Sequence, residues 1–323
     1  MIASIIISII FLSFVLIKSA DLVIVAIRRI SRDTSRKSFI ISALILAVGT
    51  SFPELSVSVT SSLEKTPSLI LGVVIGSNIA NIALIGGLSA LIAGRINVHG
   101  NYLKKDVGIA LIAGVLPLLL IVDKVLSRVD GIILISVYFA YAASFFRHRF
   151  IQISQEQREE SFIYRFLRKF NHVSSDMKKE LGKLFLGIAL LLLSADAIVK
   201  LSLALAHAAN IPIFLIGLII LAVGTSLPEF AFSVRSVEKH EPSMFFGNLL
   251  GSTIANSTLI IGVAAVIYPI EVLAVSQYTK AVLAFIVVFL TFWLFIRTKH
   301  RLERWEASIL VLLYLAFLVV EVV

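Results

Sequence analysis

Residues 49–54 read GTSFPE, and residues 224–229 read GTSLPE, 175 positions later. A second pair of motifs follows at the same offset: residues 76–81 read GSNIAN, and residues 251–256 read GSTIAN. Separated matches at one offset, without insertions, indicate that the chain is an internal duplication. The duplicated polar residues lie in apolar stretches, where a membrane disfavours polarity, so the repeat indicates more than packing.

The composition is that of a membrane protein. Hydrophobic residues make up 59% of the chain, charged residues 15%, and the mean hydropathy is +1.00, whereas an ordinary soluble domain is about 45–50% apolar. The chain has no cysteine, which excludes disulfides, thiolate metal sites and cysteine nucleophiles. We predict an all-α polytopic membrane protein in a lipid bilayer, with no cofactor and no nucleic-acid partner. The net charge of +9 is then a feature of its loops.

Ten apolar stretches each come near the length of about 20 residues that a helix needs to cross a bilayer. They predict ten transmembrane helices, five in each repeat. With five spans per repeat, the second copy enters the membrane from the opposite side. Such inverted repeats are typical of secondary transporters, whose substrate site lies near the bilayer midplane. The predicted spans are 2–27, 39–62, 68–93, 107–122, 131–146, 183–206, 211–236, 243–268, 279–296 and 306–322.

The basic residues orient the chain. Cytoplasmic loops carry an excess of Lys and Arg, and most of the 29 such residues lie in odd-numbered connections. We therefore predict both termini outside (N-out/C-out), with repeats at 1–146 and 183–323 joined by a cytoplasmic connection at 147–182. That connection is either a solvated linker or an interfacial helix on anionic lipid. The even-numbered connections hold only Lys65, Lys124, Arg128, Lys200 and Lys280.

Glu54 and Glu229 are the two acidic residues deep within predicted spans. A charge at the helix centre costs about 2.5–3.5 kcal/mol or more, so it normally faces a partner or an aqueous cavity. No Lys or Arg lies at comparable depth. The remaining counter-charge is a mobile cation or a proton.

Neighbouring residues add further oxygen atoms. Pro53 and Pro228 interrupt the helical hydrogen-bond ladder, which is expected to free carbonyls within 47–49 and 222–224. Hydroxyl and amide side chains share helix faces at i,i+3 and i,i+4 spacing. They are Thr50, Ser51, Ser77 and Asn81 in the first repeat and Thr225, Ser226, Ser252 and Asn256 in the second.

These hard oxygen donors suit Ca²⁺, which takes six to eight oxygen ligands, and Na⁺ accepts similar ligands. One Ca²⁺ or two Na⁺ would neutralise the two carboxylates, so the ions would compete. Competition at one site with alternating access is what exchange requires. A ridge of small residues is expected to let helices approach closely and to bring the ligands together. It comprises Gly72, Gly76 and Ala80, with Gly247, Gly251 and Ala255 in the second repeat.

The GTS-x-PE and GS-x-IAN motifs, present in both halves, resemble the two alpha repeats of the sodium/calcium exchanger family in the calcium/cation antiporter superfamily. The matching segments are 47–81 and 222–256. The short connection resembles prokaryotic-type members without cytoplasmic calcium-binding domains. The resemblance implies Glu54 and Glu229 as the main Ca²⁺ ligands, helped by the eight hydroxyl and amide residues above. It also implies the Ala47 and Ala222 carbonyls as Na⁺ ligands.

The resemblance further implies alternating access, by sliding of the first and sixth spans over the other eight. It implies more than two Na⁺ per Ca²⁺, which makes transport electrogenic. Several branches of the family carry Asp where this chain has Asn256, so Asn256 argues against K⁺ dependence.

We therefore predict a secondary active antiporter, not an enzyme, that exchanges Na⁺ for Ca²⁺ across the cell (plasma) membrane as a monomer. Two alternatives stay open. One is an antiporter coupled to H⁺, which transport driven by a pH gradient without Na⁺ would favour. The other is an intramembrane hydrolase with Glu54 and Glu229 as an acid–base pair. The hydrolase does not explain the duplicated serine and asparagine positions.

Overall fold

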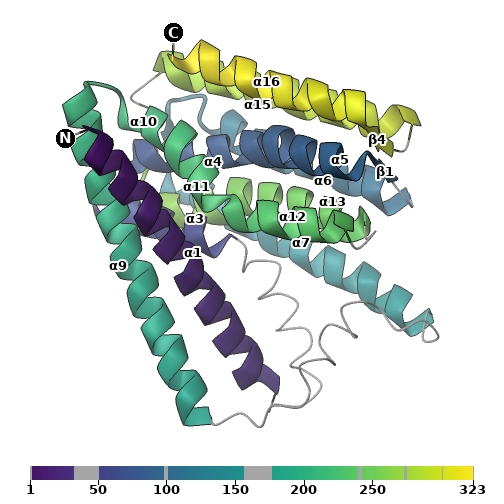
Figure 1. The fold of residues 1–323 in the computed structure, drawn as a ribbon, viewed down its shortest axis with the longest axis horizontal. Helices are drawn as coiled ribbons and strands as arrows, with labels where there is room; N and C mark the ends of the chain where they lie inside the picture. Colours follow the sequence, from purple (N-terminus) through teal and green to yellow (C-terminus); the bar gives the residue numbers. More distant parts are fainter. Residues whose placement is uncertain are drawn as a thin grey trace.

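The computed structural model describes residues 2–32, 51–97, 101–155, 177–238, 242–272, 275–299 and 301–322. They form a bundle of helices with two small two-stranded sheets (Figure 1). The first half contains α1 (Ile2–Arg32), α3 (Phe52–Leu63), α4 (Pro67–Ile79), η1 (Ala80–Ile85), α5 (Gly86–Ala93), β1 (Arg95–Asn97), α6 (Asn101–Leu120), β2 (Val125–Leu126) and α7 (Arg128–Gln155).

The second half follows the same order, with α10, η2 and α11 in addition, whose counterparts fall outside the described residues. Its elements are α9 (Met177–Ala209), α10 (Ile213–Leu215), η2 (Ile216–Leu221), α11 (Ala222–Thr225), α12 (Leu227–Glu238), α13 (Pro242–Ala255), η3 (Asn256–Ile260), α14 (Ile261–Ile267), β3 (Ile270–Glu271), α15 (Val275–Lys299), β4 (Arg301–Glu303) and α16 (Arg304–Val322). The η segments are π-helical.

Helix boundaries follow the offset seen in the motifs. α3 begins at Phe52 and α12 at Leu227, 175 residues later. α4 begins at Pro67 and α13 at Pro242, again 175 residues apart. Proline is favoured in the first turn of a helix because its missing N–H has no intrahelical partner there. The same residue types therefore start corresponding helices in both halves.

Five described helices are long and apolar enough to cross a bilayer, judged by length and composition. They are Ile2–Val23, Pro67–Ala93, Lys179–Ala209, Met244–Ile267 and Val275–Arg297. A sixth span forms if Ile213–Thr225 and Leu227–Glu238, bent by 41°, cross together. The remaining four spans, at 39–62, 107–122, 131–146 and 306–322, stay predictions, and residues 39–50 lie outside the described residues.

α4 lies in the core of the bundle. Every residue from Pro67 to Ile79 is buried, and the helix contacts α3 of its own half and α10, α11, α13 and α15 of the other. A helix that is apolar on all its faces is typical of a buried core or a membrane span. The ion-ligating candidates on α4 therefore start from a rigid, enclosed position.

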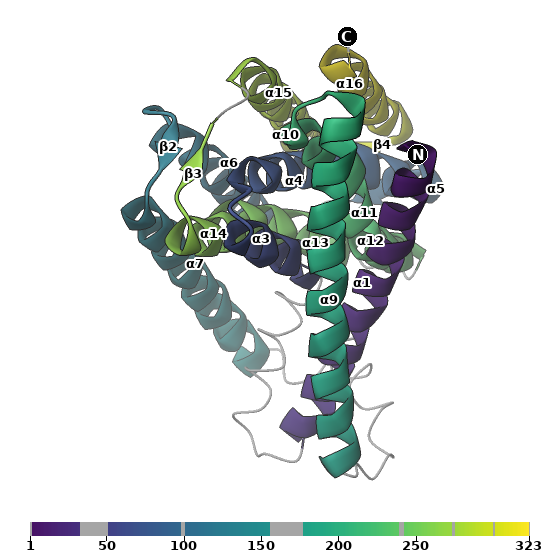
Figure 2. The same cartoon turned by 90° about the vertical axis from the view of Figure 1, so that its left-hand side faces the viewer.

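The long helices α1 and α9 pack side by side as a tilted, antiparallel pair at one edge of the bundle (Figures 1 and 2). They turn large apolar side chains outward, including Phe11 with 64% and Phe185 with 70% of its surface exposed. Apolar side chains on the outer face suit contact with lipid tails, because lipid is as apolar as they are.

Two antiparallel strand pairs connect the halves. β1 pairs with β4, so that Arg95 lies opposite Glu303, and β2 pairs with β3, so that Val125 lies opposite Glu271. The structure is otherwise helical, as predicted, and the sequence analysis did not predict these strands. Strands of two or three residues are too short to show a period-2 pattern in sequence. They form because connections that meet at the ends of the bundle satisfy each other's backbone groups.

Candidate cation-binding site

The predicted ligands are buried wherever the structure describes them. Glu54 and Glu229 are both 0% exposed, and none of the other eight described ligands exceeds 2%. Ala47 and Thr50 lie outside the described residues. The eight are Ser51, Ser77, Asn81, Ala222, Thr225, Ser226, Ser252 and Asn256.

Each glutamate lies in the first turn of a short helix. Glu54 is at the start of α3 and Glu229 at the start of α12. The break predicted at Pro228 is confirmed by the 41° bend before α12, because Pro228 has no N–H to donate to the carbonyl of Gly224. Free N–H groups at a helix start favour a carboxylate nearby, so the break helps to hold the charge of Glu229.

The predicted amide ligands lie where the helices of the second motif change from α-helical to π-helical geometry. α4 continues into η1 around Asn81, and α13 continues into η3 at Asn256. π-Helical turns within α-helices are frequent at functional sites. α3, which carries Glu54, contacts η3, and α12, which carries Glu229, contacts η1. Each glutamate helix thus packs against the amide-bearing segment of the other half.

Ser77 reaches from α4 to the first motif of the second half. Its hydroxyl lies 3.4 Å from the carbonyl oxygen of Ala222 and 3.5 Å from the hydroxyl of Thr225. The backbone N–H of Ser226 also donates to the Ala222 carbonyl, at 3.3 Å. The prediction that the break frees this carbonyl is wrong, because helical geometry lasts until Thr225. Its role as a ligand stays a prediction.

Glu229 is held by α13. The Ser252 hydroxyl donates to Glu229 Oε1 at 3.5 Å. Asn248, which we did not predict, donates to the Glu229 carbonyl oxygen at 3.2 Å and to the Ser233 hydroxyl at 3.1 Å. Its i,i+4 spacing from Ser252 was a usable signal. Comparison of the repeats passes over it, because the residue 175 positions earlier is Val73.

Glu54 faces the second half. The hydroxyls of Thr225 and Ser226 lie near its carboxylate, yet neither Glu54 oxygen reaches hydrogen-bonding geometry with a described residue. The same holds for the hydroxyl of Ser51 and the amide of Asn81. A buried carboxylate without partners is costly. A cation is the partner that this group of oxygen atoms fits best.

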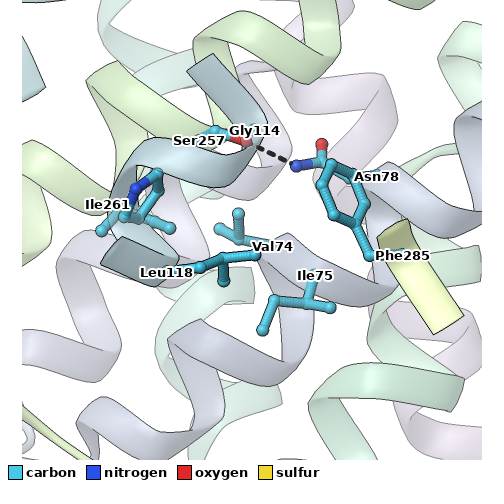
Figure 3. Close-up of a pocket in the computed structure, with 9 residues that line it drawn as sticks. Val74, Ile75, Asn78, Gly114, Leu118, Ser257, Ile261 and Phe285 are labelled. Atoms are coloured by element: carbon cyan, nitrogen blue, oxygen red, sulfur yellow. Dashed lines mark hydrogen bonds between the residues drawn. The ribbon is translucent and has the colours of Figure 1, made fainter. Parts of the chain in front are cut away.

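A hydrogen-bonded chain extends the site. Asn256 donates its amide to Asn78 Oδ1 at 3.2 Å, and Asn78 donates to the Ser257 hydroxyl at 2.7 Å. Figure 3 shows Asn78 and Ser257 beside a cavity of about 10 Å³, room for about one water molecule. We assigned no role to Asn78, because its counterpart in the other repeat is Thr253.

Comparisons with known proteins identify the family and the fold. A family model described as "Sodium/calcium exchanger protein" matches residues 4–147 and 179–323. The sodium/calcium exchanger MaX1 of Methanosarcina acetivorans is 29% identical, over 94% of this chain and 95% of its own. The inner membrane protein YrbG of Escherichia coli is 32% identical, over 85% of this chain and 84% of its own. A solved structure of the sodium-calcium exchanger NCX_Mj covers 99% of both chains, with a TM-score of 0.61 at 24% identity.

Proposed function

The chain belongs to the sodium/calcium exchanger family, and from this premise we propose that it exchanges Na⁺ for Ca²⁺ as a secondary active antiporter. It is a multi-pass membrane transporter and not an enzyme, which removes the hydrolase alternative. We further propose that it works in the plasma membrane as a monomer, since one chain supplies every predicted ligand.

The observation that carries the proposal is the state of Glu54. Its carboxylate is 0% exposed, it lies near two hydroxyls of the other half, and neither oxygen has a partner among the described residues. Together with Glu229 it gives the site a formal charge of −2. One Ca²⁺ or two Na⁺ would balance that charge, and six to eight oxygen ligands are the usual number for Ca²⁺.

In the proposed site, Glu54 and Glu229 hold Ca²⁺ from opposite halves. Hydroxyls and amides of both halves complete the shell, and the Ala47 and Ala222 carbonyls take part in binding Na⁺. The donors are oxygen atoms of Thr50, Ser51, Ser77 and Asn81, with Thr225, Ser226, Ser252 and Asn256. When Ca²⁺ leaves, Na⁺ binds in its place and restores neutrality. The transporter therefore never changes its open side with two uncompensated buried charges in the site.

We propose alternating access by two inverted five-helix repeats, in which α1 and α9 slide over the other helices. Support comes from their position, since the two helices pack against each other at the edge of the bundle (Figure 2). Both contact α3, which carries Glu54, and α1 also contacts α11, which precedes the helix of Glu229. A sliding pair would uncover the site on one side at a time. With more than two Na⁺ per Ca²⁺, each cycle moves net charge.

The test is Na⁺-driven uptake. Liposomes that contain the full chain are loaded with Na⁺ and diluted into Na⁺-free medium with ⁴⁵Ca²⁺, and Glu54→Gln and Glu229→Gln are run in parallel. We expect uptake that needs the Na⁺ gradient and is lost in both variants. Uptake that ignores Na⁺ and follows a pH gradient would assign H⁺ as the coupling ion. No uptake under either gradient would contradict the choice of substrate.

A further inference from the structure

We propose that Asn78 is a positioning residue that fixes the side-chain amide of Asn256 with its oxygen toward the transported cation. The proposal deepens the proposed function, because it rests on Asn256 as a ligand of that site. Asn78 itself does not bind the cation in this arrangement: it donates a hydrogen bond to Ser257 and accepts one from Asn256.

The orientation follows from donors and acceptors. Asn78 Nδ2 donates to the Ser257 hydroxyl at 2.7 Å, so Asn78 Oδ1 is the atom that faces Asn256. Asn256 must then present its Nδ2, which donates to Asn78 Oδ1 at 3.2 Å. The Asn256 oxygen is left for another partner. A cation binds the amide oxygen and is repelled by the NH₂ group, so this hydrogen-bonded chain selects the binding orientation.

Burial gives the selection its strength. Asn256 is 0% exposed, Ser257 1% and Asn78 2%, so bulk solvent does not compete for their hydrogen bonds. Asn256 Oδ1 has no hydrogen-bond partner among the described residues. With Asn78 held in this orientation by Ser257, a flipped Asn256 would place its Oδ1 against Asn78 Oδ1, and such a mismatch is costly in a buried network.

The hydrogen-bonded residues Asn78, Asn256 and Ser257 lie beside the candidate site. Asn256 lies on η3, which contacts α3 with Glu54. Asn78 lies behind it, beside a cavity that Gly114 of α6 and Phe285 of α15 also line (Figure 3). Asn78 thus ties the Asn256 amide of the second half to α4 of the first.

The corresponding positions of the other repeat lack this hydrogen-bonding arrangement around Asn81. At the 175-residue offset, Thr253 replaces Asn78 and Ile82 corresponds to Ser257. The Thr253 hydroxyl donates to the carbonyl of Leu249 in its own helix, at 2.9 Å. Both polar atoms of the Asn81 amide are without a hydrogen-bond partner within the described ranges. The two amides of the site are therefore unequal: Asn256 is held before the ion arrives, and Asn81 has to be oriented by it.

A double-mutant cycle tests the proposal. Na⁺-driven ⁴⁵Ca²⁺ uptake is measured against Ca²⁺ concentration for the wild type, Asn78→Ala, Asn256→Ala and the double variant. Loss of a group that orients a ligand typically weakens metal affinity about 10–100-fold. We expect Asn78→Ala to raise the KM for Ca²⁺ about tenfold and to change the maximal rate little. Asn78→Ala should add nothing once Asn256 is alanine.

Two further variants sharpen the result. Thr253→Ala is the matched control, since its hydroxyl serves its own helix, and its KM should equal that of the wild type. Ser257→Ala removes the acceptor that fixes Asn78 and should raise the KM by a smaller factor. It also carries the test if Asn78→Ala does not fold, because it removes a single buried oxygen.

An unchanged KM in folded Asn78→Ala, or independent effects of Asn78→Ala and Asn256→Ala, would overturn the proposal. Wild-type protein without Na⁺-driven uptake would instead contradict the proposed function. The same four proteins then test Asn78 through the rise in Tm that added Ca²⁺ causes, since a bound ligand stabilises the folded state. The rise should be smaller in both single variants, and the double variant should match Asn256→Ala. Equal rises in all four would overturn the proposal.

Discussion

The hydroxyl of Ser77 lies 3.4 Å from the carbonyl oxygen of Ala222, 145 residues further along the chain. The two residues belong to different motifs of different repeats. Glu54 likewise lies near Thr225 and Ser226 rather than only among ligands of its own half. The candidate site is therefore a property of the contact between the repeats, and neither repeat holds it alone.

Neutralising Glu54 should stabilise the ion-free protein. Glu54→Gln keeps the shape of the side chain and removes a buried carboxylate that has no hydrogen-bond partner among the described residues. An uncompensated buried charge is destabilising, so the Tm in Na⁺-free medium with a Ca²⁺ chelator should rise by a few degrees, about the change that 1 kcal/mol causes. Added Ca²⁺ should no longer raise it further. A lower Tm in chelator would show that Glu54 is already compensated without a cation.

Close packing at Gly76 gives a second prediction. A Cβ at Gly76 would overlap the carbonyl oxygen of Leu218, so Gly76→Ala forces α4 and η2 apart. Overpacking of this kind costs about 1–3 kcal/mol, and the separation also moves Ser77 from its partners. We expect a lower Tm and a large loss of Na⁺-driven uptake. Gly108→Ala is the control: no described atom lies within 4 Å of its Cβ, and its Tm should be unchanged or slightly higher.

The internal repeat predicted the candidate ligands, but not the hydrogen bonds and helix contacts that hold them. The duplicated residues predicted that Glu54 and Glu229 are buried and that the helical ladder breaks at Pro228, because proline and buried charge have strong local consequences. Asn78 and Asn248 were missed because the residues at the 175-residue offset, Thr253 and Val73, are of other types. Contacts between distant helices depend on how the halves pack, and no local spacing encodes that.

The π-helical segments were missed for a related reason. η1 and η3 begin close to Asn81 and Asn256 in stretches whose sequences favour an ordinary helix. A π-helical turn changes the register by one residue without a characteristic residue type. α3 and α12 pack against these segments in the folded protein, and the local sequence gives no sign of that contact.

A third carboxylate should make transport depend on pH. Asn256→Asp adds a negative charge to a site that already holds Glu54 and Glu229. At high pH the ionised Asp should hold Ca²⁺ more tightly and lower its KM; at low pH the protonated Asp resembles Asn, and the KM should return toward the wild-type value. Uptake is measured against Ca²⁺ concentration at several pH values, with the wild type as control, to show whether the KM falls as the pH rises. A variant whose KM shifts by the same factor at every pH would place residue 256 away from the ion.

Net charge movement gives the last prediction. If more than two Na⁺ leave for each Ca²⁺ that enters, positive charge flows outward during Ca²⁺ uptake, so an inside-positive potential should accelerate it. The potential acts with about 2.3 kcal/mol per elementary charge for each 100 mV. In Na⁺-loaded liposomes, valinomycin with high external K⁺ sets the inside positive, and high internal K⁺ sets it negative. Uptake should be faster in the first case; equal rates would mean two Na⁺ per Ca²⁺, matching only the two carboxylates of Glu54 and Glu229.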